Sequence, residues 1–157
     1  MARLFDTLPQ RGTLEQILLR PGRNLGMQNA RKVEVIPGIG LVGDRFKGKV
    51  DSKRQVTLFQ VENLSVLASV LHADAIDPRT LRRNLLIRGI NLNALRGRQF
   101  RIGEVVLEGT VACHPCSKME QALGAGGYNA MRGMGGLCAR VVYGGFIQVG
   151  EEVRLDI

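Results

Sequence analysis

The sequence is poor in the residues that several functional classes require. It has no tryptophan, aromatic residues make up 4% of its 157 residues, and it contains three cysteines and two histidines. So few aromatic side chains cannot supply a surface on which nucleic acid bases stack. A small, odd number of cysteines argues against a disulfide framework, and the expected compartment is therefore the reducing cytoplasm.

Long apolar runs and acidic residues are also scarce. No apolar run approaches the ~18–20 residues that cross a bilayer, and MARLFDTLPQRG at the N-terminus does not look like a secretory signal. The 22 basic residues outnumber 14 acidic ones, giving a formal net charge of +8. Because no helix-turn-helix or paired Cys/His finger is present, we expect a solvated basic surface or a small phosphorylated ligand rather than nucleic acid.

Glycine, with 20 residues, separates short β-prone segments along the chain. The composition, 45% hydrophobic and 23% charged, is typical of a globular protein, and we expect a single domain over 1–157. Helical spacing of apolar residues predicts one amphipathic helix over 61–74. A shorter helical segment is expected at 117–123. The ordered chain is expected to begin at 13–21, where alternating and continuous apolar positions are mixed. Strands are expected near 31–36, 54–60, 84–88, twice within 97–112 and three times within 137–157. This pattern predicts a mostly antiparallel barrel or closed sheet with a few short helices.

The segment VACHPCSKME, residues 111–120, holds the main candidates for chemistry. It places Cys113 and Cys116 three positions apart, with His114 and Pro115 between them. A C-x-x-C pair can form a reversible disulfide. However, thioredoxin-like motifs open a long helix in a βαβ pattern, whereas the surroundings here are rich in strands.

Three other interpretations of this segment stay open. A structural zinc site needs four ligands, so Cys138 and either His114 or His72 would have to join the pair. Alternatively, Cys116 alone ligates a soft transition metal such as molybdenum, or carries sulfur. Finally, free cysteines are often buried as small hydrophobic groups, and this is our interpretation of Cys138 in the apolar segment GLCARVV.

The segment GLVGDRFKG, residues 40–48, is a candidate anion site. Gly43 permits a positive φ and lets backbone N–H groups approach a ligand. Asp44 can accept a hydrogen bond from a neighbour, while Arg45 and Lys47 are expected to face the anion.

A second candidate anion site is LRRNLLIRG, residues 81–89. In a strand, Arg82 and Arg83 would point to opposite faces, so we expect one of them to point inward. An inward arginine near a cleft is a good bidentate partner for phosphate, and Asn84 adds a donor and an acceptor.

Taken in order, these segments resemble the MOSC family, domains related to the C-terminal part of molybdenum cofactor sulfurases. The resemblance extends from about Arg20 to the C-terminus. Its most telling combination is R-x-N-L, then a Pro-Cys, then a closing GG-x-I-x-x-G. It is carried, in order, by GLVGDRFKG, RQVTLFQVE, LRRNLLIRGINLNALRGRQFRIGEVVLEGT, ACHPCSKME and GGLCARVVYGGFIQVGEEV.

The resemblance implies a MOSC-type β-barrel that handles the molybdenum cofactor or its sulfur. Cys116 would be the metal ligand or sulfur carrier, with Cys113 as a resolving thiol and His114 near the thiolate or a substrate oxygen. The cofactor is a phosphorylated pterin, which would give the positive charge of the chain a partner. Some family members reduce N-hydroxylated compounds.

The resemblance also assigns residues to cofactor binding. Gly43 and Asp44 match the GD turn of the family. The R-x-N-L piece reads R-R-N-L here, so either Arg82 or Arg83 would be the functional arginine beside Asn84.

Several modules of known family members are missing. The chain has no room for a pyridoxal-phosphate domain, and three cysteines at these spacings cannot hold a ferredoxin cluster. A reductase or a sulfurase would therefore have to be a separate partner protein. Two alternatives remain beside a molybdenum-dependent enzyme: a non-catalytic cofactor carrier or sensor, and a thiol redox protein using Cys113 and Cys116.

Overall fold

Seven strands close into a ring in which each strand pairs with its two neighbours. The structure is a computed structural model that describes residues 2–46 and 48–156. Around the ring the strands are β11 (Glu152–Leu155), β7 (Gln99–Ile102), β8 (Val105–Ala112), β9 (Leu137–Tyr143), β5 (Val56–Gln60), β6 (Leu85–Arg88) and β1 (Gly12–Leu19). Antiparallel pairing of Gly12 with Val153 joins β1 to β11 and closes the barrel. The expected mostly β, barrel-type fold is therefore confirmed.

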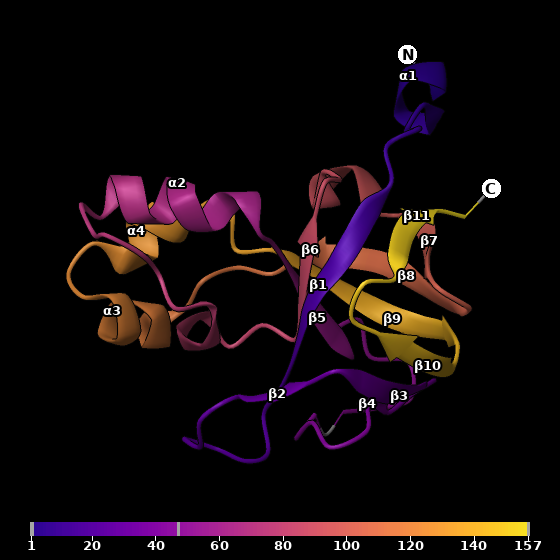
Figure 1. The fold of residues 1–157 in the computed structure, drawn as a ribbon, viewed down its shortest axis with the longest axis horizontal. Coiled ribbons are helices and arrows are strands. Elements are labelled where there is room, and N and C mark those ends of the chain that lie inside the picture. Colours follow the sequence, from indigo (N-terminus) through magenta and orange to yellow (C-terminus); the bar gives the residue numbers. More distant parts are fainter. Residues whose placement is uncertain (1, 47, 157) are drawn as a thin grey trace.

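A smaller sheet, several helices and two 3₁₀ turns complete the fold (Figure 1). The small sheet has the order β10 (Gly145–Gln148), β3 (Lys32–Ile36) and β4 (Gly40–Leu41), and β2 (Gln28–Ala30) pairs with β1. The helical elements are α1 (Ala2–Asp6), α2 (Glu62–Val70), η1 (Pro78–Leu81), η2 (Leu92–Leu95), α3 (Ser117–Leu123) and α4 (Gly127–Met131). Among the described residues, no helix is both long and apolar enough to span a membrane.

A bulge in β1 explains why its apolar residues do not simply alternate. Leu14 pairs with Ile87 and Gln16 pairs with Leu86, so β1 carries one extra residue between them. Side chains on a regular strand alternate between the two faces, and the extra residue shifts that alternation. Leu14 and Ile17, three positions apart, therefore both lie in the core of the barrel.

Strands β5 and β6 are parallel, in contrast to their antiparallel neighbours, and both of their faces are buried. Val56 and Leu58 of β5 lie in the barrel core, whereas Phe59 packs in a second core on the outer face. Parallel strands need a crossover connection, and α2 and η1 supply it here. Because helices cover the outer face, these two strands have nearly continuous apolar sequences.

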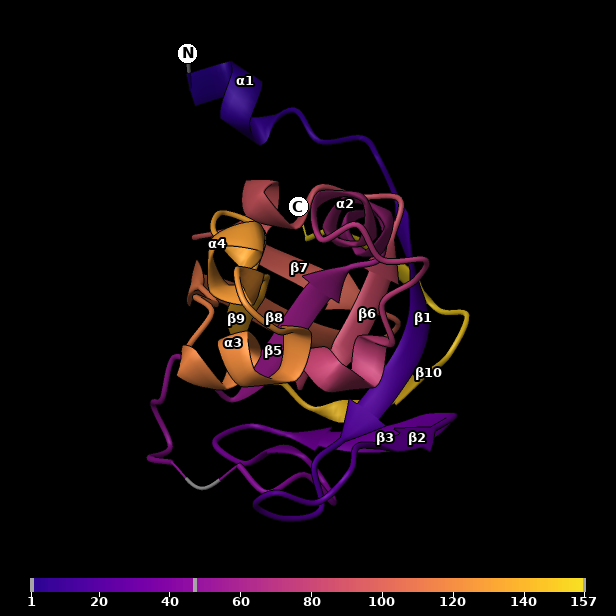
Figure 2. The ribbon, with the colours of Figure 1, turned by 90° about the vertical axis from the view of Figure 1, so that its left-hand side faces the viewer.

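The helices α2, α3 and α4 cover this outer face and share the second core (Figure 2). Each contributes a deeply buried side chain: Leu67 from α2, Met119 from α3 and Met131 from α4. These side chains pack with Phe59 and Leu86 of the barrel. The second core therefore fixes α3, whose first turn follows the CHPC segment, relative to the barrel wall.

Helix α2 ends four residues before the predicted boundary at 74. His72 has a positive φ of 55°, and its N–H donates to the carbonyl of Ser69 at 3.3 Å. The next N–H, that of Ala73, donates to the carbonyl of Ala68 at 2.9 Å. This pair of hydrogen bonds is a Schellman motif, which terminates helices with a left-handed residue. Because this position is more often glycine, the histidine did not mark the end of the helix in the sequence.

Candidate functional site

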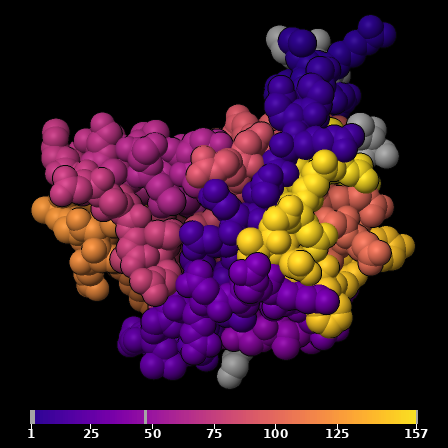
Figure 3. All heavy atoms as spheres, viewed as in Figure 1, coloured from indigo at the N-terminus to yellow at the C-terminus, as the bar shows by residue number. Residues whose placement is uncertain are grey.

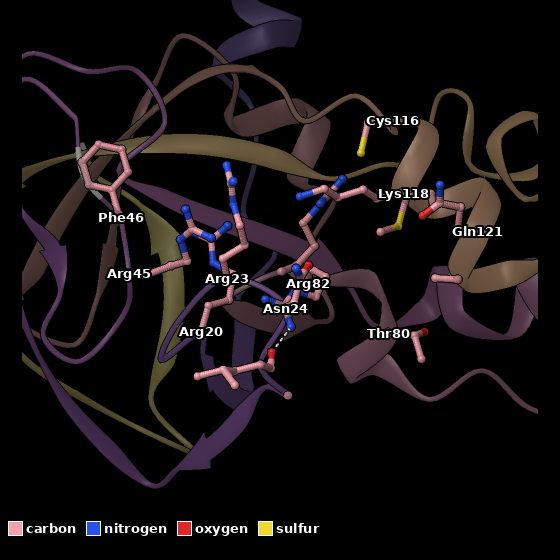
Figure 4. Close-up of a pocket in the computed structure, with 15 residues that line it drawn as sticks. Arg20, Arg23, Asn24, Arg45, Phe46, Thr80, Arg82, Cys116, Lys118 and Gln121 are labelled. Atoms are coloured by element: carbon pink, nitrogen blue, oxygen red, sulfur yellow. Dashed lines mark hydrogen bonds between the residues drawn. The ribbon is translucent and has the colours of Figure 1, made fainter.

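An open cavity lies where the first turn of α3 faces η1 and the loops after β1 and β4 (Figure 4). Its volume of about 800 Å³ falls within the ~300–1,000 Å³ that is usual for small-molecule sites. None of the described residues that line it is acidic, whereas five are arginines and one is lysine. The lining residues are Arg20, Arg23, Asn24, Leu25, Gly26, Arg45, Phe46, Thr80, Arg82, Arg83, Cys116, Lys118, Met119, Gln121 and Ala122. The charge of this lining favours an anionic ligand.

Cys116 is an exposed thiol at the start of α3, and it lines the cavity. Its backbone is extended, with φ −134° and ψ 179°, and its carbonyl accepts the N–H of Met119 at 2.9 Å. The side chain makes no capping hydrogen bond to the helix. Because Pro115 before it and Met119 after it are buried, the thiol is held at the cavity wall by anchors on both sides.

The loop before β9 supports the CHPC segment from behind. The N–H of Cys113 donates to the carbonyl of Gly136 at 2.9 Å. A Cβ atom at Gly135 would lie 2.0 Å from the carbonyl oxygen of Cys113, so a side chain there would have to displace the CHPC backbone. Glycine at position 135 is therefore needed for this close approach.

Arg83 connects the same loop to the cavity. Only 8% of the residue is exposed. Its Nε donates to the carbonyl of Gly135 at 2.8 Å, and its Nη1 donates to the carbonyl of Leu81 at 3.1 Å. Within residues 2–46 and 48–156, buried Nη2 has no hydrogen-bond partner. Since buried donors are nearly always paired, Arg83 has one donor to offer to an acceptor in the cavity that it lines.

Arg82 also lines the cavity, next to the loop that follows β1. It follows η1 and has a left-handed φ of 61°. Its guanidinium donates to the carbonyls of Leu25 and Gly22 and so holds the loop after β1. Burial and the nearby charges of Arg20 and Arg45 lower the pKa of Arg82. The three cations therefore repel one another, and a bound anion would relieve that repulsion.

Asp44, Arg20 and Asn84 form a buried network behind the cavity. The Asp44 side chain is fully shielded, its Oδ2 accepts from Arg20 Nη2 at 2.9 Å, and its Oδ1 accepts from Asn84 Nδ2 at 3.1 Å. Burial alone would raise the pKa of Asp44, but the hydrogen bonds and charge of Arg20, with the bond from Asn84, lower it overall. Asn84 Oδ1 also accepts the Thr57 N–H at 3.1 Å. This network joins the 40–48 segment to β5 and to the start of β6.

The third cysteine lies beside Cys113. Cys138 on β9 is fully buried, as expected, and Cys113 is half-buried. Hydrogen bonding from the Cys138 thiol and the charges of Arg83, Arg54 and Arg20 lower the pKa of Cys113 to about 6, against the effect of burial. The same bond and burial raise the pKa of Cys138. Cys113 is therefore the thiol of this pair that ionises.

The structure gathers some of the predicted site residues in the cavity and places others elsewhere. Cys116, Arg45, Arg82 and Arg83 line it. Gly43, Asp44 and Asn84 lie outside the lining, where Asp44 and Asn84 support the wall. Cys113 and the exposed His114 also lie outside it, and the prediction for Lys47 falls outside the described residues. The expectation that one of the two adjacent arginines points inward is met by Arg83.

No zinc site of the kind considered from the sequence is formed. In the part of the chain that the structure describes, no group of three or more His, Cys, Asp and Glu side chains could hold a metal ion.

Sequence reasoning missed several lining residues because they stand in no motif. Arg20 and Arg23 lie within the RPGRN turn after β1, and Lys118 and Gln121 lie three positions apart on α3. Residues three apart share a helix face, so the spacing of the last two was a usable signal. The RPGRN turn and α3 come together only when the barrel closes, and no local sequence pattern predicts that contact.

One family model matches the chain, and several solved structures share its fold. Residues 41–154 match the MOSC domain. Among solved structures, the YuaD protein from Bacillus subtilis has a TM-score of 0.76 at 16% identity, covering 95% of this chain and 98% of that one. YiiM from Geobacillus stearothermophilus has a TM-score of 0.76 at 14% identity, covering 93% of this chain and 75% of that one. YiiM from Escherichia coli has a TM-score of 0.72 at 17% identity, covering 92% and 70%. The comparison with curated proteins gave no match.

Proposed function

Because the chain belongs to the MOSC domain family, which is generally linked to the molybdenum cofactor, we propose that its arginine-rich cavity binds that cofactor. The observation that carries the proposal is the presence of the exposed thiol of Cys116 and an unpaired, buried arginine donor in one carboxylate-free lining. Cys116 is the protein's ligand to the metal, or the acceptor of sulfur destined for it.

The described residues fit a phosphorylated pterin with a metal-bound sulfur group. Arg83 Nη2 offers a buried donor, and Arg23, Arg45 and Arg82 surround it with positive charge. Guanidinium groups bind phosphate oxygens in pairs. Phe46 adds an aromatic surface to the cavity. A thiolate at Cys116 is a soft ligand, which suits molybdenum.

Each group of residues has its own task in this proposal. When bound, the cofactor supplies two-electron chemistry at its metal. Arg83 and Arg82 hold its phosphate, and the Asp44–Arg20–Asn84 network keeps the wall in place. We assign contacts with the substrate to Lys118 and Gln121, which line the cavity on the helix that Cys116 precedes.

As a sulfur carrier, Cys116 needs a separate donor. Its thiolate attacks the outer sulfur of a donor persulfide. The donor's sulfur–sulfur bond breaks, its thiolate leaves, and Cys116 becomes a persulfide. As a reductase component, the protein would convert an N-hydroxylated substrate, two electrons and two protons into an amine and water, with the electrons from a separate reductase partner in the cytoplasm.

Metal and mass analysis of protein made in a cofactor-competent host tests the proposal. We expect molybdenum, or a mass increase of one sulfur atom on Cys116, and loss of both in Cys116→Ser. Protein that carries neither molybdenum nor a persulfide would contradict it.

Arginine variants test the phosphate site separately. Arg83→Met should lower cofactor content strongly, whereas Arg79→Met, an exposed arginine outside the lining, should not. Arg23→Gln on the exposed rim provides a second variant that leaves the buried hydrogen bonds intact. Equal cofactor content in all three variants would count against this site.

Turnover separates an enzyme from a non-catalytic carrier. Cofactor-loaded protein with an artificial reductant should convert a hydroxylamine to the amine if the protein is an enzyme. Stable cofactor binding without conversion of any N-hydroxylated substrate would favour a carrier or sensor.

A further inference from the structure

Two cysteines lie outside the cavity lining: Cys113, which directly follows β8, and Cys138 on the neighbouring strand β9. Ala112 at the end of β8 pairs with Leu137 on β9, and the next N–H, that of Cys113, donates to Gly136 at 2.9 Å. Cys113 is thus opposite Gly136, and Cys138 lies two residues further along β9. Cys113 and Cys138 are therefore diagonal neighbours across the end of the β8–β9 ladder.

We propose that Cys113 and Cys138 form a reversible dithiol site that exchanges with low-molecular-weight disulfides, and that its oxidation state tunes anion binding in the cavity. This differs from the pair expected from the sequence motif, Cys113 and Cys116. Cys116 lines the cavity, whereas Cys113 lies at the end of the β8–β9 ladder, next to the strand that carries Cys138. The dithiol part is independent of the proposed function, and the tuning part rests on it.

The geometry favours a labile rather than a structural disulfide. Diagonal neighbours in antiparallel strands have Cα atoms ~7–8 Å apart, somewhat beyond the ~4.4–6.8 Å of most disulfides. The β8–β9 ladder is irregular between Gly109 and Ala112, next to this pair, so the backbone can shift there. A disulfide formed under such strain is more easily reduced.

The exchange uses the half-buried thiol first. The Cys113 thiolate, stabilised by Arg83 from before β6, Arg54 from before β5 and Arg20 from the end of β1, attacks one sulfur of a small disulfide. One small thiol leaves, and a mixed disulfide remains on Cys113. Cys138 then loses its proton and attacks the Cys113 sulfur, and the second small thiol leaves. Two protein thiols are oxidised and one small disulfide is reduced to two thiols.

Arg83 links this site to the cavity. Its Nε donates to the carbonyl of Gly135, which packs against the Cys113 backbone. Oxidation converts the Cys113 thiolate into a neutral disulfide sulfur, so Arg83 loses a nearby negative charge. A phosphate in the cavity then no longer competes with that charge, so the oxidised protein should bind phosphate more tightly.

Disulfide mapping tests the dithiol. The full-length protein is incubated with glutathione disulfide, its free thiols are trapped, and its peptides are analysed by mass spectrometry. We expect a Cys113–Cys138 disulfide that a reductant reverses, both in the natural sequence and in Cys116→Ser. In Cys138→Ser we expect reaction to stop at a Cys113–glutathione mixed disulfide.

The disulfide that is found decides whether the Cys113–Cys138 pair exists. A Cys113–Cys116 disulfide, or no intramolecular disulfide, in the natural sequence would overturn the proposal even if Cys138→Ser failed to fold. Because Cys116→Ser removes the proposed metal ligand but keeps the dithiol, failure of one proposal is distinguishable from failure of the other.

Titration with inorganic phosphate tests the link to the cavity. Oxidised and reduced Cys116→Ser should differ in phosphate Kd by about 5-fold or more, the lower end of typical coupling between sites, with the oxidised form tighter. Equal affinities would overturn the coupling. Reversal of the order would overturn its electrostatic cause.

Discussion

At the level of single residues, the site depends on one carboxylate that never reaches the ligand. Asp44 is fully shielded and accepts hydrogen bonds from both Arg20 and Asn84. Removing its charge leaves the Arg20 guanidinium without a partner in a partly buried position. Breaking one side of a buried ion pair costs about 3–5 kcal/mol.

We therefore expect Asp44→Asn to lower the free energy of unfolding by about 3–5 kcal/mol at pH 7, measured by urea denaturation. The pKa of Asp44 is below its ordinary 3.8 in the folded protein. Its stabilisation is thus present above the unfolded pKa and disappears as the pH falls through the folded pKa. The two proteins should converge in strongly acidic solution. Asp77→Asn, in an exposed ion pair, is the control and should have little effect.

The ionisation of Cys113 gives a second prediction at this scale. Alkylation of Cys113, followed by peptide mass spectrometry, should increase with pH with a midpoint near its pKa of about 6. Cys138→Ala removes the main hydrogen bond to the thiolate, so the midpoint should move to higher pH. An unchanged midpoint in Cys138→Ala would show that the thiol pair does not determine the ionisation.

The sequence allowed prediction of the residues that carry a motif but not of those that converge from separate loops. The CHPC segment stood out by its two thiols, and the resemblance to the MOSC family then distinguished Cys116 from Cys113. Arg20 and Lys118 are ordinary basic residues in sequence, and only the fold brings them to one cavity. Asp44 and Asn84 matched a family pattern, but their place behind the wall depends on strand register.

At the level of elements, the turn after β8 depends on the glycine loop that precedes β9. Gly135→Ala would place a methyl group 2.0 Å from the Cys113 carbonyl oxygen, so the CHPC backbone must move. We expect a loss of about 1–3 kcal/mol in stability, as for other overpacked positions, together with weaker phosphate binding. Calorimetry with inorganic phosphate and urea denaturation would measure the two effects.

A neighbouring glycine provides the matched control for this prediction. Gly133 has a positive φ of 82°, but nothing lies within 4 Å of a Cβ added there. Gly133→Ala should therefore cost about 1–2 kcal/mol through backbone strain and leave phosphate affinity unchanged. If both variants weakened binding equally, the close approach at Gly135 would not be the cause.

Most elements were predictable because their periodicity or their glycine boundaries are local. The strands at 54–60 and 84–88 were expected within a mostly antiparallel barrel, and the strands β5 and β6 formed there are parallel to each other. The relative direction of two strands is set by the path of the connection between them, not by their own residues. The bulge in β1 was equally hidden, because it appears only in the pairing with β6.

At the level of the whole molecule, the two cores are joined through strands that belong to both. β1, β5 and β6 contribute side chains to the barrel core and to the core beneath the helices. Loss of packing in one core should therefore weaken the other. In a protein with two separable units, loss of packing in one core would leave the stability of the other unchanged.

Leu155→Ala tests this connection from the side of the barrel. Leu155 is 4% exposed on β11 and lies in the barrel core, so its truncation should cost about 2–5 kcal/mol. Hydrogen exchange should then speed up in α2 as well as in the strands, with a single unfolding transition. Leu4→Ala on α1, where Leu4 is 69% exposed, is the control. Faster exchange confined to β7 and β11 would contradict the expectation.

The pairing of β1 with β11 also has a consequence for how the protein is made. The space-filling view shows the N-terminal segment beside the last strand (Figure 3). A growing chain adds residues in order, so β1 leaves the ribosome long before β11 exists. Until residues 152–155 emerge, β1 and β7 each lack one of their hydrogen-bonding neighbours, β11. Exposed strand edges of this kind pair readily with other chains. Pairing of residues 152–155 with both strands thus removes two exposed edges at once.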